Sequence, residues 1–345
     1  MQSPIFKTAY SFKKIKLYII TTVVALSMFS FILKVDAQAV TDSSYHYTHQ
    51  VSQGFGARIL KCAAKLFLPK NSIPRKLARE DYVSDAAPIP KKIVKEFQID
   101  TIKVQGRNVY TFAHKDKKAG KYVLFLHGGA YINNIFSQHW NFVAKIVRET
   151  HCTFIVPDYP LAPASNYSEA FAMLSAVYKS LLSRAGAENI IFMGDSAGGG
   201  LALAFAQQQK LEGNKLPEQL ILLSPWLDVT MTNPEIKDIQ KKDVTLRADN
   251  LILAGKTWAG TSDPADYLIS PVYGSLQGLP RISIFIGTYD ILIADCRKLK
   301  SMAVQQGVPM NYFEYPKMFH DWVMLVSLKE SKQAMSQICS LITGS

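Results

Sequence analysis

The most constraining feature of this sequence is the pentapeptide Gly194-Asp195-Ser196-Ala197-Gly198, which matches the pattern G-x-S-x-G. The pentapeptide lies between the apolar run Ile190–Met193, which predicts a buried strand, and residues Ala197–Lys210, which predict a helix. A serine on a sharp turn between a strand and a helix has its hydroxyl raised above the edge of a parallel sheet. This context predicts that Ser196 is a nucleophile. A serine with a merely structural role would not require a turn between a strand and a helix.

Strands and helices are predicted to alternate along most of the chain after about residue 97. Phe97–Val104 and Val109–His114, with Gly106 between them, predict a hairpin. The later alternation predicts an α/β fold with a mainly parallel central sheet and helices on both faces. The strand candidates are Tyr122–Leu126, Thr153–Val156, Ile190–Met193, Leu220–Leu223, Ile282–Ile286 and Asn311–Tyr315. The helix candidates are Ser137–Thr150, Tyr167–Arg184, Ala197–Lys210, Ala294–Gln306 and Trp322–Ile342.

Two parts of the chain do not follow this alternation. Residues 226–268 have helical patterning, best at Asn250–Trp258, but no strand, which predicts an insertion above the sheet at about residues 228–265. Residues 40–95 are expected to form an N-terminal cap or linker segment. Within them, Tyr45–Gln53 is interpreted as a polar linker, and Ala57–Leu68 has apolar residues at helical spacing. The catalytic domain is expected to occupy residues 96–345.

The first 39 residues have the order of a secretory signal peptide. An uncharged run, Leu17–Leu33, is followed by the small-x-small site Ala37-Gln38-Ala39. The run is at the lower length limit of a membrane-spanning helix, so an uncleaved signal anchor is the alternative. With either, we expect the body of the protein to be exported, and either secreted or held at the cell surface. The basic residues ahead of the run are Lys7, Lys13, Lys14 and Lys16.

The chain has a formal net charge of +12, and its body begins with a dense group of basic residues. Contact with an anionic cell surface and a merely solvated basic face are both consistent with this charge. Nucleic-acid binding is not expected, because no binding motif accompanies the charge. The four cysteines form no C-x-x-C pattern, so neither a metal site nor a redox motif is indicated. The basic group comprises Lys61, Lys65, Lys70, Arg75, Lys76 and Arg79.

The segment His127-Gly128-Gly129-Ala130 directly follows the apolar strand candidate Tyr122–Leu126. Acyl transfer passes through a tetrahedral intermediate with a negative oxygen, which preorganised N–H groups must stabilise. Glycines allow the backbone to approach that oxygen closely. We therefore expect an oxyanion hole formed by the N–H groups of Gly128, Gly129 and Ala197.

A nucleophilic serine also requires a base and an acid that orients the base. Of the seven histidines, His320 follows the last strand candidate, where the order serine, acid, histidine places the base. Asp290 follows the strand candidate Ile282–Ile286 in a short loop, a position where parallel sheets place functional groups. Asp295 and Asp321 are alternative acids.

At these residues the sequence resembles the hormone-sensitive-lipase-like family of α/β hydrolases, which includes bacterial esterases and acetyl esterases. The resemblance implies a nucleophile at Ser196, a base at His320 and its orienting acid at Asp290. Two residues depart from the family pattern: Ala130 replaces a third glycine, and Asp321 replaces the glycine that usually follows the histidine. The further similar segments are Asp158-Tyr159-Pro160-Leu161-Ala162-Pro163, Ser224-Pro225-Trp226-Leu227-Asp228, Gly287-Thr288-Tyr289-Asp290 and Phe319-His320-Asp321.

The resemblance implies hydrolysis of carboxylic esters with short acyl groups, such as acetyl, and no cofactor or metal. The expected substrates are small esters or an acylated surface polymer. Two other functions remain open from the sequence: cleavage of amide or peptide bonds, because one fold can perform both reactions, and a catalytically silent binding module at the cell surface.

Overall fold

A single sheet of nine strands organises the body of the protein, in the order β1-β9-β8-β7-β6-β4-β5-β3-β2. All strands of this sheet run in one direction except β3, which is antiparallel to both of its neighbours. The mainly parallel sheet and the hairpin of β2 and β3 confirm the predictions. The strands are β1 (Tyr45–Thr48), β2 (Gln98–Val104), β3 (Arg107–Ala113), β4 (Tyr122–Leu126), β5 (Thr153–Pro157), β6 (Ile190–Asp195), β7 (Gln219–Leu223), β8 (Arg281–Gly287) and β9 (Met310–Tyr315).

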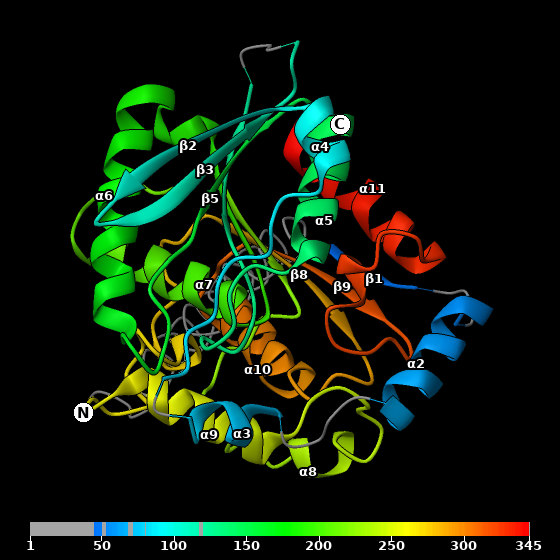
Figure 1. Ribbon diagram of the computed structural model, residues 1–345. Helices are drawn as coiled ribbons and strands as arrows, with labels where there is room; N and C mark the ends of the chain where they lie inside the picture. Colours follow the sequence, from blue (N-terminus) through cyan, green and yellow to red (C-terminus); the bar gives the residue numbers. More distant parts are fainter. Residues whose placement is uncertain (1–44, 50–52, 68–71, 80, 117–119, 345) are drawn as a thin grey trace, which may run out of the picture. The chain divides into compact units, whose positions relative to one another are not determined.

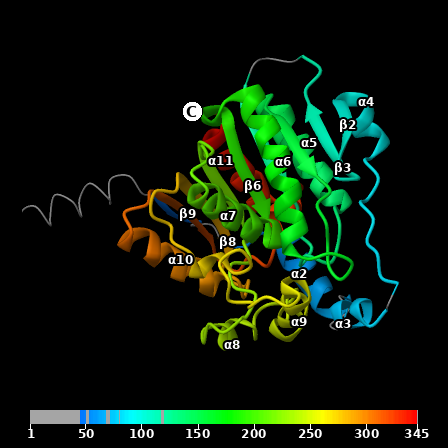
Figure 2. The same cartoon turned by 90° about the vertical axis from the view of Figure 1, so that its left-hand side faces the viewer.

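Helices cover both faces of the sheet (Figures 1 and 2). The helices α6, α7 and α10 pack on one face, and α5 and α11 pack on the other. The helices are α2 (Phe55–Phe67), α3 (Ser72–Leu77), α4 (Lys91–Glu96), α5 (Ser137–Thr150), α6 (Tyr167–Ala185), α7 (Ser196–Leu211), α8 (Ile236–Ile239), α9 (Ala248–Ala259), α10 (Ile293–Gln305) and α11 (Lys329–Thr343), with short 3-10 turns η1 (Ala187–Asn189), η2 (Pro271–Tyr273) and η3 (Trp322–Met324).

This computed structural model describes residues 45–49, 53–67, 72–79, 81–116 and 120–344. The predicted leader, residues 1–39, lies outside the described residues. Within the described ranges, no helix is both long enough and apolar enough to cross a membrane. The cysteines at 62, 152, 296 and 339 are all free thiols in this structure.

Alternating side chains of the strands divide the interior into two cores, because successive residues of a strand point to opposite faces. On β4, Leu124 and Leu126 lie in the core with α6 and α7, while Val123 and Phe125 lie in the core with α5 and α11. The central strands are therefore buried on both faces. This explains why their sequences are continuous apolar runs rather than alternating ones.

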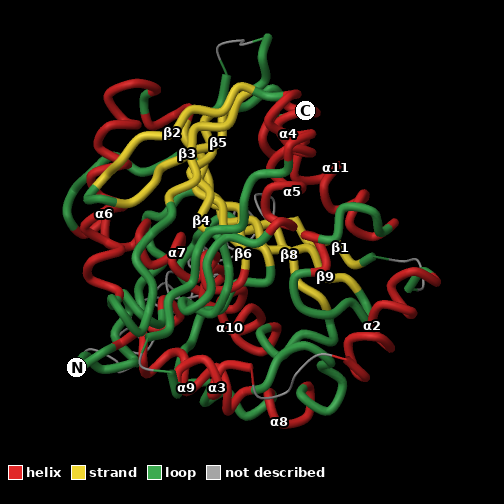
Figure 3. The backbone as a smooth tube through the Cα atoms, in the orientation of Figure 1, coloured by secondary structure: helices red, strands yellow, loops and turns green. Residues whose placement is uncertain are grey.

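The parallel strands bring several loops to one edge of the sheet (Figure 3). The carboxyl ends of β4, β6, β8 and β9 all lie at this edge, because these strands are parallel neighbours in one sheet. The candidate residues follow these ends: the segment from His127 after β4, Ser196 after β6, Asp290 after β8 and His320 after β9. Residues separated by more than 100 positions in the chain are thereby placed in one group.

Two predictions of local structure are wrong. Tyr45–Thr48 is not a linker but the edge strand β1, which pairs parallel to β9 and packs Tyr47 against Phe313, with ring centroids 6.1 Å apart. The single helix predicted over Trp322–Ile342 is divided into η3 and α11. Asp321 adopts a left-handed backbone conformation with φ of 52°, which starts the short turn of η3 instead of a regular helix.

The predicted insertion contains α8 and α9, and no strand forms between β7 and β8 in this fully described stretch. Helix α9 belongs to the main core, because Trp258 is fully buried and its ring stacks on that of Tyr131 with centroids 4.3 Å apart. Tyr131 directly follows the glycine-containing segment after β4. The insertion thus supports the loop at the functional edge of the sheet.

We expect Trp258→Ala to lower the free energy of unfolding by about 3–5 kcal/mol, because it removes a buried indole and leaves a cavity beside Tyr131. Urea denaturation followed by far-UV circular dichroism measures the change. Leu253→Ala is the control, since Leu253 lies on the same helix and is 38% exposed. Equal losses in both variants would contradict the packing role of Trp258.

Candidate active site

Ser196 stands at the junction between β6 and α7, where the predicted turn is formed. Its φ of 50° lies in the left-handed region that residues other than glycine seldom occupy. A Cβ atom on Gly194 would lie 2.3 Å from the carbonyl oxygen of Gly198, and one on Gly198 would lie 1.9 Å from that of Leu126. Neither position has space for a side chain, which explains both glycines of the pentapeptide.

The structure brings Ser196, His320 and Asp290 together in a hydrogen-bonded series. His320 Nε2 lies 2.9 Å from Ser196 Oγ, and His320 Nδ1 lies 2.8 Å from Asp290 Oδ2. Asp290 follows β8, is 0% exposed and also accepts a hydrogen bond from Leu292 N at 2.9 Å through Oδ1. A proton on Nδ1 that is donated to Asp290 leaves Nε2 able to accept the hydroxyl proton of Ser196.

The alternative acid Asp295 does not contact His320. It lies in the first turn of α10, where its Oδ1 accepts a hydrogen bond from Asn233 Nδ2 at 2.9 Å. Burial raises the pKa of Asp295 to about 6. Its buried carboxylate is therefore part of the packing between α10 and the loop at Asn233.

The other alternative acid, Asp321, does contact His320, but from the opposite side to Asp290. Its Oδ2 lies 3.0 Å from His320 Nε2, the same nitrogen that faces Ser196. Its Oδ1 is buried and has no hydrogen-bond partner among the described residues. Burial raises the pKa of Asp321 to about 6, against the opposing effect of the charge on His320.

His320 is thus held between two carboxylates. Burial lowers the pKa of His320, but the charges of Asp321 and Asp290 outweigh burial and raise this pKa well above its usual value. Protonated His320 cannot accept a proton from Ser196. A reaction that needs neutral His320 is therefore expected to become faster as the pH rises through this raised pKa.

Of the three N–H groups expected to form the oxyanion hole, one is already used within the protein. Gly128 N donates a hydrogen bond to Asp195 Oδ1 at 3.0 Å, so this N–H is not available to an oxyanion. No described group accepts a hydrogen bond from the N–H groups of Gly129, Ala130 or Ala197. The available donors of the segment therefore come from its third and fourth residues, together with Ala197 at the start of α7.

The sequence did not indicate that His139 belongs to this site. His139 Nδ1 accepts a hydrogen bond from Phe136 N at 2.9 Å, which places the proton on Nε2, and Nε2 lies 3.0 Å from Asp195 Oδ2. Asp195 thereby joins the segment after β4 to α5 while remaining fully buried. Sequence spacing gave no signal for this contact, because 56 positions separate the two residues.

A cavity of about 610 Å³ adjoins these residues. Its wall is mostly apolar and includes Gly129 and His320 as well as three residues of α2. A cavity of this size can hold a small organic molecule. The apolar side chains that line it are Leu60, Ala63, Ala64, Phe136, Phe319, Met324 and Leu325.

The chain belongs to the family described as having the alpha/beta hydrolase fold, whose model matches residues 123–324. That range contains all three residues of the hydrogen-bonded series.

Known relatives agree with this membership. A triacylglycerol lipase of Mycobacterium tuberculosis is 34% identical over 60% of this chain, and the match spans 43% of the lipase, less than half of its length. An esterase of Acinetobacter venetianus is 32% identical over 66% of this chain and 76% of the esterase. A crystal structure of a hormone-sensitive lipase from a metagenome library has a TM-score of 0.73 at 27% identity, covering 85% of this chain and 99% of that one. These relatives are hydrolases of the esterase type.

Asp321→Asn is expected to move the acid limb of the profile of kcat/KM against pH down by about 1–2 pH units, because it removes one anion beside His320. Asparagine keeps the size of the side chain and tolerates a left-handed backbone. Ester hydrolysis followed in a pH-stat measures the profile. Asp295→Asn, which removes a buried carboxylate away from His320, should leave the profile unchanged. A profile of Asp321→Asn identical to that of the unaltered protein would refute the effect.

Proposed function

We propose that this chain is a serine carboxylic-ester hydrolase in which Ser196, His320 and Asp290 form the catalytic triad. The observation that carries the proposal is the pair of contacts of His320, 2.9 Å to Ser196 Oγ and 2.8 Å to Asp290 Oδ2. A largely buried, hydrogen-bonded series of these residue types at the carboxyl edge of a parallel sheet has the geometry that acyl transfer requires.

In the proposed reaction, Ser196 Oγ attacks the ester carbonyl while His320 Nε2 accepts the hydroxyl proton. His320 then donates this proton to the leaving alcohol, and the acyl group remains on Ser196. Water, activated in turn by His320, releases the acid and restores the serine. Asp290 keeps His320 oriented and stabilises its protonated form.

The oxyanion of the tetrahedral intermediate is proposed to accept hydrogen bonds from the N–H groups of Gly129 and Ala197, with Ala130 as a third donor. This choice is supported by the engagement of Gly128 N with Asp195. Ala197 N is additionally favoured by its place in the first turn of α7, where the helix dipole stabilises negative charge.

Short acyl groups are the proposed substrates. The apolar wall near His320 is interrupted by polar side chains, because Gln138 and Thr245 line the same cavity. Each methylene group of a longer acyl chain that lies against these polar groups instead of an apolar wall loses about 0.8 kcal/mol of burial.

Ser196→Ala is expected to lower kcat/KM for p-nitrophenyl acetate by at least about 10³-fold, because the acyl-enzyme can no longer form. The unaltered protein should be most active on acetyl and butyryl esters and much less active on decanoyl esters. Release of p-nitrophenol measures both. Ser183→Ala, at an exposed position on α6, serves as the control.

Full activity in Ser196→Ala would reject the triad. A separate assay of the unaltered protein compares an ester and an anilide of the same acyl group. Hydrolysis of the anilide alone would favour a peptidase. Folded protein inactive on both would favour a silent binding module.

Export of the body, and action on small esters or on an acylated polymer at the cell surface, are also part of the proposal. They are supported by the leader over residues 1–39, with its basic start, uncharged run and small-x-small site.

The full-length chain expressed in a bacterium should yield a mature protein that begins at Val40 and is found outside the cytosol. N-terminal sequencing and cell fractionation measure this. Retention of the leader in the membrane fraction would instead identify a signal anchor. A full-length protein in the cytosolic fraction would contradict export.

A further inference from the structure

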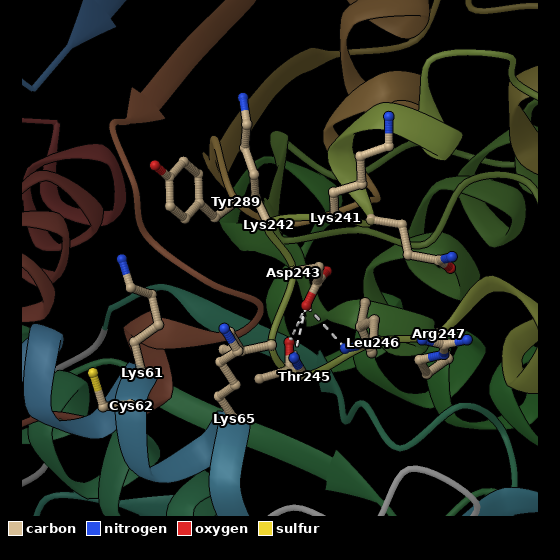
Figure 4. Close-up of a pocket in the computed structure, with 12 residues that line it drawn as sticks. Lys61, Cys62, Lys65, Lys241, Lys242, Asp243, Thr245, Leu246, Arg247 and Tyr289 are labelled. Atoms are coloured by element: carbon tan, nitrogen blue, oxygen red, sulfur yellow. Dashed lines mark hydrogen bonds between the residues drawn. The ribbon is translucent and has the colours of Figure 1, made fainter.

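A second cavity, of about 520 Å³, lies beside the active-site cavity. Its walls come from α2 and from the stretch between α8 and α9 (Figure 4). In this view Lys61 and Lys65 stand on α2, Lys241 and Lys242 project from the stretch above them, and Asp243 lies between. The cavity is lined by Lys61, Cys62, Lys65, Gln240, Lys241, Lys242, Asp243, Val244, Thr245, Leu246, Arg247 and Tyr289.

Positive charge dominates this cavity, because its lining has five basic side chains and one acidic one. Two of the basic groups are paired outside the lining: Lys241 with Asp238 at 2.6 Å and Arg247 with Asp249 at 3.5 Å. For Lys61, Lys65 and Lys242 the described part of the chain provides no acidic partner within 4.0 Å. Three ammonium groups thus line one cavity with no ion-pair partner among the described residues.

The acidic residue of the lining does not balance these charges. Asp243 Oδ1 accepts hydrogen bonds from Thr245 N at 2.8 Å and Leu246 N at 2.9 Å, and Oδ2 accepts one from Ile291 N at 2.9 Å. Both carboxylate oxygens are therefore used to hold this loop against the residue that follows Asp290. The role of Asp243 is to fix the wall of the cavity.

The Lys61 ammonium donates a hydrogen bond to the neutral Gln53 Oε1 at 3.0 Å, and the rest of its environment is consistent with an anion site. Burial lowers the pKa of Lys61 below its usual value, and the charges of Lys317 and Arg58 lower it further. The ammonium lies 4.7 Å from the ring centre of Tyr289, and Lys242 lies 5.9 Å from the same centre. Like charges gathered in this way repel one another, and a bound anion would relieve the repulsion.

This cavity adjoins the proposed catalytic residues. Thr245 lines both cavities, and Tyr289 directly precedes Asp290. Helix α2 lines both as well, with Leu60, Ala63 and Ala64 on the apolar side and its lysines on the other. A molecule in the apolar cavity beside His320 can therefore extend toward the cationic one.

We propose that the cationic cavity binds a phosphate group on the alcohol part of the ester substrate. This inference rests on the proposed ester hydrolysis and specifies its substrate class: an acyl ester of a phosphorylated alcohol. Hydrolysis consumes one water and yields the carboxylic acid and the free phosphorylated alcohol, while the phosphate itself is unchanged.

Phosphate fits this lining better than a carboxylate does. Lysine ammonium groups are compact point charges, each with three donors, and bind phosphate as such. Their stems are flexible, so the lysines that line the cavity can turn toward a bound phosphate, which has several oxygens and a greater negative charge. A carboxylate offers two oxygens and a single charge, and is matched best by the planar fork of an arginine.

The test compares two esters that differ only in the phosphate, 1-butyrylglycerol and 1-butyrylglycerol 3-phosphate. We expect kcat/KM to be higher for the phosphorylated ester by roughly tenfold at low salt, and the ratio to fall with ionic strength. The double variant Lys65→Gln/Lys242→Gln should bring the ratio close to one. Lys298→Gln is the matched control, because Lys298 lies 4.7 Å from the ring centre of Tyr273 and lines a different cavity.

A ratio near one both for this pair and for a long-chain 1-acylglycerol and its 3-phosphate offered in phosphatidylcholine vesicles would overturn the phosphate site while leaving ester hydrolysis intact. An unchanged ratio in the double variant would overturn it as well. Failure to hydrolyse either ester would instead contradict the proposed function. In that case calorimetric binding of glycerol 3-phosphate to the Ser196→Ala variant decides the site: binding about tenfold weaker with the two lysines replaced supports it, and equal binding overturns it.

Two sources of the phosphate are distinguished by how the ester is presented. A preference seen with the monomeric butyryl ester identifies a soluble phosphorylated alcohol. A preference seen only when a long-chain 1-acylglycerol 3-phosphate is offered in phosphatidylcholine vesicles identifies a lipid headgroup.

Discussion

The left-handed backbone of Ser196 is the constraint on which the rest of the active site depends. This conformation requires that β6 turn directly into α7, and the turn requires that the backbones of Gly198 and Leu126 be almost in contact. Such contact is possible only because β4 and β6 are parallel neighbours in register. The order of the strands in the sheet therefore helps to determine where the hydroxyl of Ser196 lies.

Buried and half-buried carboxylates then fix the loops that the sheet has brought together, and each does so through a different set of donors. Asp195 joins the loop after β4 to His139, Asp290 orients His320, and Asp243 holds the loop that separates the two cavities. Asp321 differs from these, because one of its oxygens has no partner. Its charge acts on His320 and does not hold loops together.

The sequence predicted the sheet, its flanking helices and the three residues of the proposed triad, because those signals are local. Apolar runs mark strands that are buried on both faces. The glycines of the G-x-S-x-G pattern mark a turn that has no space for side chains at those positions. The contacts of His139 and of the N–H of Gly128 could not be predicted. These contacts depend on which loops meet at the edge of the sheet. Residues so far apart in the chain produce no regular spacing in the sequence. The edge strand β1 was missed since four mostly polar residues resemble a linker.

Helix α2 has a position that couples two properties usually considered separately. Within 13 residues it presents an apolar strip to one cavity and a basic strip to the other, and its buried contact with the body includes Ala57. A rotation of this helix about its axis would alter both walls at once. In the proposed binding mode, evolutionary change in the preference for one end of a substrate is thus not independent of change at the other end. Exchange of this one segment between relatives would transfer both preferences as a unit.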